Sequence, residues 1–312
     1  FADMGQIVVK GLKLIQFKKC NISNIAIRKS DSFILIMKSS TVQIENCNIE
    51  HTSGSMMSIT STQTVIISSI KIHSAISYWS YINELAAILE CINSMVFILM
   101  NSVLKDNTGS LVSLSNIKTS VLQKNMVVNC ISLKHGALYI ESLMIAKIYL
   151  HHNDFLQCHC IHGSGALTLR YLVNDKREEN RFEEMSFTIA SSKFLGCTSQ
   201  NNGAAVLLVH KLNKYINANI HIQDSIFVKN QATNGGSVAV YGFRHFTVAR
   251  CNFIYNAANV SGGAIFVLNT NQTTFINNTF TKNKAHEGNG GSICLINFNE
   301  TNIYQNHFDN NY

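Results

Sequence analysis

Apolar and polar residues alternate in short segments along this chain, and in its C-terminal third the segments repeat. The stretches SIFVKNQATNGGSVAV, CNFIYNAANVSGGAIFV and NTFTKNKAHEGNGGSICL each contain Phe-x-x-Asn, a polar stretch and then Gly-Gly-small-apolar. A further Phe-x-x-Asn begins at Phe308. Self-similarity at such a period is typical of repeat architectures, in which each repeat packs on its neighbours.

The same register can be projected backwards over the whole chain with one apolar anchor per repeat. The anchors are Ile22, Ile49, Ile72, Val103, Met126, Phe155, Phe194, Phe227, Phe253, Phe280 and Phe308. The residue five positions before each anchor is apolar, and the residue seven positions before it is β-branched or aromatic. These positions alternate with polar neighbours, which is the period of a β-strand. Short strands recurring in this way, without amphipathic helices, indicate a solenoid with about three strands per coil.

The pattern therefore predicts an all-β fold, a right-handed parallel β-helix of about eleven rungs that spans residues 1–312 as one unit. The hand follows from the chirality of parallel crossover connections. At about 4.8 Å per rung, the rod would be roughly 50 Å long. The longest interval between anchors contains DKREENRFEE, which predicts a protruding charged loop near residues 171–185.

Two columns of side chains are expected to stack along the rod. The interior column consists of aromatic anchors: Phe155, Phe194, Phe227, Phe253, Phe280 and Phe308. The second column is an amide ladder at a corner, in which each side chain bonds its neighbour one rung away. Its expected members are Asn129, Asn230, Asn256, Asn283 and Asn311.

Composition agrees with continuous sheet and excludes some classes of function. The chain has no proline, a residue that central strands exclude. Its net charge of +7 is spread thinly, without a basic stripe, so we do not expect nucleic-acid binding. The longest apolar run, residues 86–104, is interrupted by Glu90, Asn93 and Asn101, so we expect no membrane span. The chain begins with Phe1 and shows no signal-peptide pattern, so we take it to be a mature or truncated product.

The stretch HHNDFLQCHCIHGSGAL, residues 151–167, has the ligand types of a metal site. Strand alternation would place Cys158 and Cys160 on one face and His159 on the other, which separates the ligands. We therefore interpret the stretch as scaffold and expect no metal and no other cofactor.

The nine cysteines raise the question of disulfides. Cys158 and Cys197 each follow an anchor by three residues, and Cys20 and Cys47 each precede one by two. Equivalent positions on successive rungs lie about 4.8 Å apart, within the Cα range of a disulfide. The alternative for both pairs is a stack of free thiols, packed as small apolar groups.

Glycosylation sequons suggest where the protein works. They occur at Asn21, Asn259, Asn271, Asn277 and Asn299. Four of them lie within 41 residues, which indicates a secreted glycoprotein, extracellular or at the cell surface.

The combination of GGA[I/L/V] and FxxN resembles the repeats of polymorphic outer membrane proteins and related bacterial and protist surface proteins. The full GGAI occurs at Gly262–Ile265, and NGGSV, NGGSI, NGAAV, SGAL and HGAL are degenerate versions. The motif-level resemblance covers roughly residues 126–312. It implies a right-handed parallel β-helix that works as a surface adhesin.

Three functions remain in view. A polysaccharide lyase or hydrolase, as found on other β-helices, would need carboxylates that converge on neighbouring rungs. Asp106, Asp154, Asp224 and Asp309 occupy different slots of the repeat. The acidic cluster of Glu178, Glu179, Glu183 and Glu184 reads instead as a solvated loop.

We therefore expect a non-enzymatic structural rod, a fibre or filament subunit whose copies stack end to end. The segments GQIVV and HFDNNY, near the two ends, both read as parts of a rung, and an uncovered strand can pair with another chain. The alternative is an adhesin that binds glycans or other surface proteins.

Overall fold

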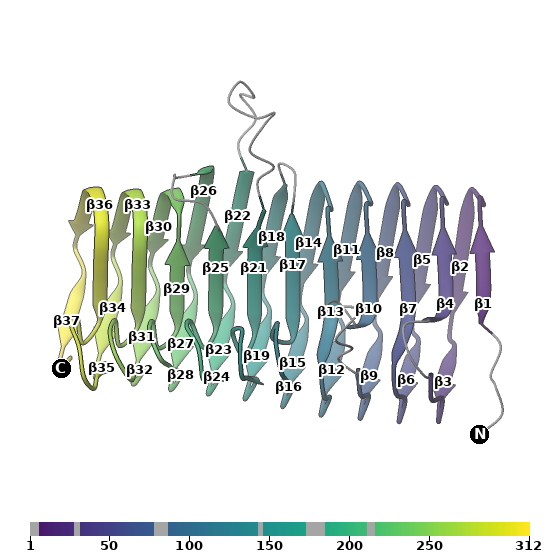
Figure 1. Ribbon diagram of the computed structural model, residues 1–312, viewed down its shortest axis with the longest axis horizontal. Coiled ribbons are helices and arrows are strands. Elements are labelled where there is room, and N and C mark those ends of the chain that lie inside the picture. Colours follow the sequence, from purple (N-terminus) through teal and green to yellow (C-terminus); the bar gives the residue numbers. More distant parts are fainter. Residues whose placement is uncertain (1–5, 28–31, 78–86, 143–145, 173–184, 211–215) are drawn as a thin grey trace.

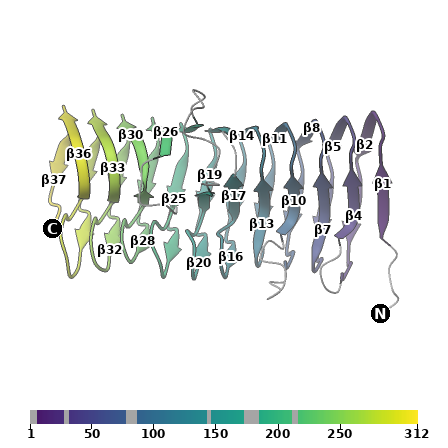
Figure 2. The same cartoon turned by 45° about the horizontal axis from the view of Figure 1, so that its top comes forward.

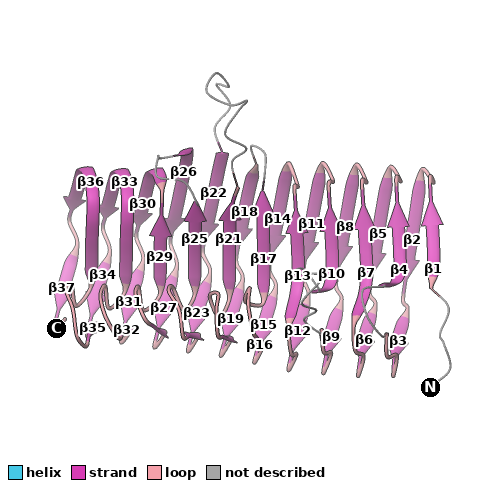
Figure 3. Cartoon of the chain, viewed as in Figure 1, coloured by secondary structure: helices cyan, strands magenta, loops and turns pink. Residues whose placement is uncertain are grey.

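The computed structural model of the chain describes residues 6–27, 32–77, 87–142, 146–172, 185–210 and 216–312. The described residues form strands β1 to β37 and contain no helix (Figure 3). Every pairing between these strands is parallel, for example β19 with β23 and β23 with β27. The predicted parallel β-helix is confirmed, and Figure 1 shows it as one rod with the two chain ends at opposite tips.

Each rung contributes a strand to three faces of the rod. The first face contains β1 (Ile7–Lys10), β4 (Ser32–Met37), β7 (Ser55–Thr60), β10 (Ala87–Ile92), β13 (Ser110–Ser115), β17 (Leu138–Ser142), β21 (Leu167–Tyr171), β25 (Val206–His210) and β29 (Val238–Tyr241). The second face contains β2 (Leu14–Lys18), β5 (Thr41–Glu45), β8 (Thr64–Ser68), β11 (Val96–Met100), β14 (Thr119–Gln123), β18 (Lys147–His151), β22 (Met185–Ala190), β26 (Ile216–Gln223) and β30 (Phe243–Ala249). The long strands β33 (Ile265–Ile276) and β36 (Ile293–Tyr304) run through both faces, since β33 pairs with β29 and with β30.

The third face is an 11-stranded sheet of three-residue strands. Its strands are β3 (Asn21–Ser23), β6 (Asn48–Glu50), β9 (Lys71–His73), β12 (Val103–Lys105), β15 (Met126–Val128), β19 (Asp154–Leu156), β23 (Lys193–Leu195), β27 (Ile226–Val228), β31 (Asn252–Ile254), β34 (Thr279–Thr281) and β37 (His307–Asp309). A short 6-stranded sheet lines the loop that returns to the first face, as the turned view shows (Figure 2). It contains β16 (Ile131–Ser132), β20 (His159–Cys160), β24 (Thr198–Ser199), β28 (Gln231–Ala232), β32 (Ala257–Ala258) and β35 (Lys284–Ala285).

The predicted phenylalanine column occupies the interior behind the third face. Successive rings stack with centroids 4.7–5.0 Å apart and planes within 7° of parallel, from Phe155 to Phe308. Phe155, Phe194, Phe227, Phe253 and Phe280 are fully buried, and each such side chain contributes roughly 1.5–3 kcal/mol through burial. Phe308 belongs to the same stack but is 47% exposed, because β37 has no strand beyond it among the described residues.

The predicted register is wrong by one residue in two rungs. Phe155 pairs with Val127, and Val127 pairs with Leu104, so the interior positions there are Leu104 and Val127. The expected anchors Val103 and Met126 point outward and are 36% and 41% exposed. A slip of one residue exchanges the two faces of a strand, and adjacent apolar residues in VLK and MVV conceal it.

Both ends of each third-face strand bend through residues with positive φ. Before the strand these residues are Lys19, Asn46, Ser69, Asn101, Lys124, His152, Ser191, Asp224, Arg250, Asn277 and Gln305. After it they are Asn24, His51, Ser74, Asp106, Asn129, Gln157, Gly196, Lys229, Tyr255, Lys282 and Asn310. Holding a non-glycine residue in this conformation costs roughly 1–2 kcal/mol. The hydrogen bonds and packing with neighbouring rungs must offset that cost. Every described rung therefore turns at the same two places.

The Gly-Gly pairs stand where the chain enters the first face. Gly262 has a φ of +68°, and a Cβ built on Gly263 would lie 2.0 Å from the backbone oxygen of Gly291. The first glycine is needed for its conformation and the second for the close approach of the next rung.

The predicted charged loop near residues 171–185 falls almost entirely outside the described residues. Strand β21 ends at Tyr171 and β22 begins at Met185.

Candidate functional site

The predicted asparagine ladder is present in the last four of its expected positions. Asn230, Asn256 and Asn283 are fully buried, and each side chain bonds the next rung through Nδ2, at 3.0–3.1 Å from the following Oδ1. The same Oδ1 accepts the backbone N–H of the preceding asparagine. The ladder satisfies amides that the corner would otherwise leave buried and unpaired, so its role is structural.

The prediction that Asn129 belongs to this ladder is wrong. Because of the one-residue slip, the ladder position of its rung is held by Cys130, which is buried, while Asn129 is exposed with a φ of 51°. Its Nδ2 donates to Asp106 Oδ1 at 2.8 Å on the surface. An upstream member that the sequence analysis missed is Asn107, whose Oδ1 accepts the Ala75 N–H at 2.9 Å.

A second polar ladder, which the sequence analysis also missed, precedes the interior residues of third-face strands by two positions. The members that accept a backbone N–H of the preceding rung are Ser102, Asn125, Asn153, Ser192, Ser225, Asn278 and Asn306. The recurrence of small polar residues at this slot is the sequence signal that could have revealed both the ladder and the correct register.

All nine cysteines are free thiols, so neither candidate disulfide is formed and the alternative of stacked thiols holds for both pairs. Cys158 stands between Cys130 and Cys197 in one buried column, and its Sγ lies 3.6 Å from Leu156 O as a donor. Hydrogen bonds with Cys130 and Cys197, together with burial, raise the pKa of Cys158 well above its usual range. Parallel stacking points the side chains of a column in one direction, whereas a disulfide requires Cβ atoms about 3.8 Å apart and a crossed geometry. The pair Cys20 and Cys47 follows the same arrangement.

The side chains of the Cys- and His-rich stretch are divided between the interior and the outer side of the rod. Cys158 and Cys160 are fully buried, whereas His159 lies on the outer side with Nδ1 2.6 Å from Thr198 Oγ1. The described residues contain no group of three or more His, Cys, Asp or Glu side chains that could hold a metal ion.

The sequon asparagines lie at the surface. Asn21, Asn259, Asn277 and Asn299 are exposed, and Asn271 is half-buried. Asn299 Nδ2 donates to Asn271 Oδ1 at 2.7 Å, so these two side chains stack on neighbouring rungs.

The described carboxylates do not converge on one surface. Asp154, Asp224 and Asp309 occupy different slots relative to the interior column, and Asp106 follows Leu104 by two residues. Glu90 accepts a hydrogen bond from Ser58 at 3.2 Å, and burial raises the pKa of this carboxyl. Glu141 accepts the hydroxyl of Tyr139, whose pKa burial also raises. Glu178, Glu179, Glu183 and Glu184 lie outside the described residues.

The third face carries a row of outward aliphatic side chains. One position after the interior residue, five successive strands present Val128, Leu156, Leu195, Val228 and Ile254, all partly exposed. We call these five residues the aliphatic row. Its continuity distinguishes it from the isolated apolar residues that any protein surface carries.

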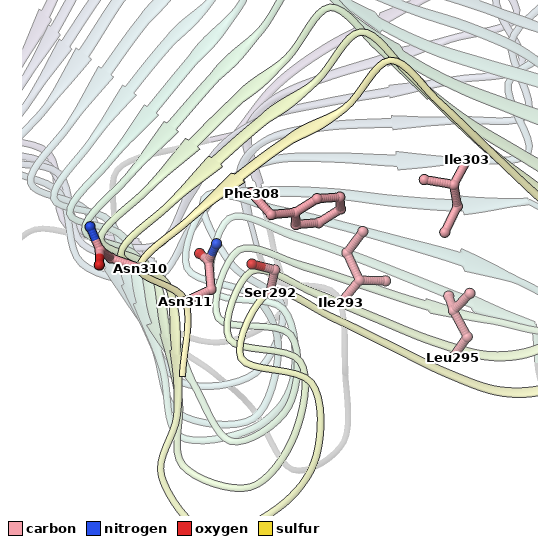
Figure 4. A pocket seen from close by; sticks show the side chains of 7 residues that line it. All are labelled: Ser292, Ile293, Leu295, Ile303, Phe308, Asn310 and Asn311. Atoms are coloured by element: carbon pink, nitrogen blue, oxygen red, sulfur yellow. The ribbon is translucent and has the colours of Figure 1, made fainter.

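The edge formed by β36 and β37 opens the interior columns to solvent. A hollow there is lined by Ser292, Ile293, Leu295, Ile303, Phe308, Asn310 and Asn311. Figure 4 shows Phe308 and Ile303 facing the same space as Ile293 and Leu295. The hollow is lined mainly by the residues of the last rung that continue the interior columns, and none of its lining residues is charged.

Comparison with known proteins adds no relative: no family model, curated protein or solved structure matches this chain. Among the residues described, there is no helix with the length and hydropathy needed to cross a membrane.

Proposed function

We propose that this protein is a non-enzymatic structural rod, a fibre or filament subunit that works outside the cell. The observation that carries this proposal is the continuity of the interior. Stacked aromatic rings and two polar ladders join successive rungs. These aromatic and polar side chains therefore stiffen the rod and do not line a cleft. Association of copies end to end is part of the proposal.

Electron microscopy of the purified protein tests the rod directly. Isolated rods or filaments of rod width are the expected images, and compact globular particles would count against the proposal. Release of reducing ends from a panel of polysaccharides would instead favour the lyase or hydrolase.

The extracellular setting has its own test, because it rests on the sequons. Four of the five asparagines are exposed, as attachment requires. We expect the intact mass of natively produced protein to fall on treatment with an N-glycosidase. A mass equal to that of the bare chain would remove this part of the proposal.

A surface adhesin is the second candidate, and the aliphatic row favours it. A contiguous apolar surface on a soluble protein commonly marks a protein contact. Binding of the chain to immobilised glycans or surface proteins, lost on Leu195→Asp, would support the adhesin over a purely structural rod.

A further inference from the structure

The third face has a pattern of charge and apolarity that is complementary to itself. Around the aliphatic row, Asp154 on β19 pairs in register with Lys193 on β23, so opposite charges occupy the same slot on adjacent rungs. The same slot holds Met126 one rung before and Ile226 one rung after. All four side chains point away from the core, because the neighbouring position in each strand is the interior residue.

A twofold axis that is parallel to the strands and passes between β19 and β23 brings this face against a second copy. Such an axis reverses the order of the rungs but leaves each slot opposite the same slot, so β19 faces β23 and β15 faces β27. Asp154 then meets Lys193 of the second copy, and each contact occurs twice. In the aliphatic row, Leu156 meets Leu195 and Val128 meets Val228.

The flanking positions match under the same operation. Met126 meets Ile226, so apolar side chains also oppose each other in the slot of Asp154 and Lys193. At the corner before the strand, the exposed Lys124 meets Asp224, which binds Arg250 of its own chain at 2.7 Å. Within the central four strands each charged residue therefore meets an opposite charge, and each outward aliphatic residue meets another. Outside them the match ends: Lys229 meets Asn129 at the corner after the strand, Lys105 meets Ile254 one strand further out, and Glu50 meets Asp309 at the last overlapping pair.

Other arrangements of two copies lack this match. An axis through β23 would set Lys193 against Lys193, and an axis through β19 would set Asp154 against Asp154. An axis along the rod would exchange the slots and bury Asp154 against the aliphatic row, which leaves a charge unpaired. Of these four arrangements, the axis between β19 and β23 alone sets Asp154 against Lys193.

The face is large enough for a specific contact. Under this axis ten of the eleven strands lie opposite a strand of the second copy, and at about 4.8 Å per strand and a width of about 15 Å including the corners they offer roughly 700 Å² per copy, close to the roughly 800 Å² of a standard interface.

We propose that the third face is a lateral dimerisation surface, on which two antiparallel copies of the chain pack through the aliphatic row with Asp154 and Lys193 in mutual contact. This inference goes beyond the end-to-end association described above and fails or succeeds separately from it.

Charge exchange at the two central residues tests the proposal. Sedimentation of the native chain is expected to show a monomer–dimer step, whether or not association through the ends adds larger species. Lys193→Asp and Asp154→Lys, studied separately, should each weaken dimerisation about tenfold or more, because two attractive contacts become repulsive. An equimolar mixture of the two variants should restore it, since the introduced lysine then faces the introduced aspartate and the native pair is retained.

Lys147→Asp is the matched control, because Lys147 is an exposed lysine on β18 of the second face. It changes the net charge as Lys193→Asp does and should leave the dimer intact. A native chain that stays monomeric at millimolar concentration would overturn the proposal. So would a dimer that responds equally to Lys193→Asp and Lys147→Asp, or a mixture that stays monomeric. Open-ended oligomers indifferent to all of these substitutions would show that copies associate through their ends.

Discussion

The side-chain oxygen of Asn256 accepts two hydrogen bonds from Asn230 of the preceding rung, from the backbone nitrogen at 3.0 Å and from Nδ2 at 3.1 Å. Asn256 Nδ2 in turn donates to Phe227 O and to Asn283 Oδ1, both at 3.0 Å. One buried amide therefore joins three consecutive rungs.

Replacing this amide should be costly. Asn256→Ala leaves the N–H of Asn230 and the carbonyl of Phe227 unpaired in the core, and we expect a loss of about 3 kcal/mol in the free energy of unfolding. Urea denaturation measures it. The matched control is Asn129→Gly, since Asn129 is exposed and glycine tolerates its positive φ, and we expect a change below about 1 kcal/mol. Equal losses in both variants would contradict the assignment of the ladder.

The phenylalanine stack should be equally sensitive to truncation. Phe253 is fully buried, with ring centroids 4.7 Å and 4.9 Å from its neighbours, so Phe253→Ala should destabilise the fold by about 3–5 kcal/mol through the cavity that it leaves. Phe308→Ala should cost clearly less, because that ring is already 47% exposed. Thermal unfolding of the two variants side by side makes the comparison.

Thiol labelling should distinguish the nine cysteines. Burial raises the pKa of Cys91 and of Cys251 to about 12, which keeps both thiols neutral and unreactive at pH 8. We expect iodoacetamide to modify Cys20, which alone is partly exposed, at least tenfold faster than the other eight. Peptide mass spectrometry reads the order of modification. After unfolding without reductant all nine should react; two unmodified residues, Cys158 and Cys197, would indicate the disulfide that the structure lacks.

Glu90 should make stability depend on pH. Because burial raises the pKa of this carboxyl in the folded state, the folded protein favours the protonated form. Stability from this group is fully present below the unfolded pKa of about 4.3 and is lost as pH rises through the folded pKa. Glu90→Gln, which cannot ionise, should therefore be more stable than the native chain at pH 7 and no more stable at pH 4. Denaturation midpoints at both values measure this, and a gain of the same size at both would rule out the carboxylate as the cause.

The sequence predicted the fold because interior positions recur in every rung. The register was readable wherever the anchor is Phe, since one large ring stands between smaller neighbours in KFLG, NFIY and TFTK. It failed at Val103 and Met126, where two consecutive apolar residues made both strand faces plausible. Ser102 and Asn125, two positions before the true interior residues, held the missing information.

The surface was less predictable than the core, for a physical reason. Stacked free thiols and a disulfide both need cysteines at equivalent positions on successive rungs, with similar distances between their Cα atoms. The spacing of Cys158 and Cys197 in the sequence therefore could not distinguish the two. The aliphatic row was not recognised because Val128 stands two positions after the misplaced anchor Met126, whereas Leu156 stands one after Phe155. Only the correct pairing aligns Val128 with Leu156.

Parallel stacking also determines how the rod should respond to mechanical load. The hydrogen bonds between rungs run along its long axis, so tension applied at the two tips acts on these bonds in sequence, one rung after another, instead of shearing many together. The 27 residues from Phe253 to Phe280 would add roughly 90 Å of extended chain when one rung detaches. The rod should therefore resist bending as a solid bar and lengthen under tension in discrete steps, as a spring that opens one coil at a time.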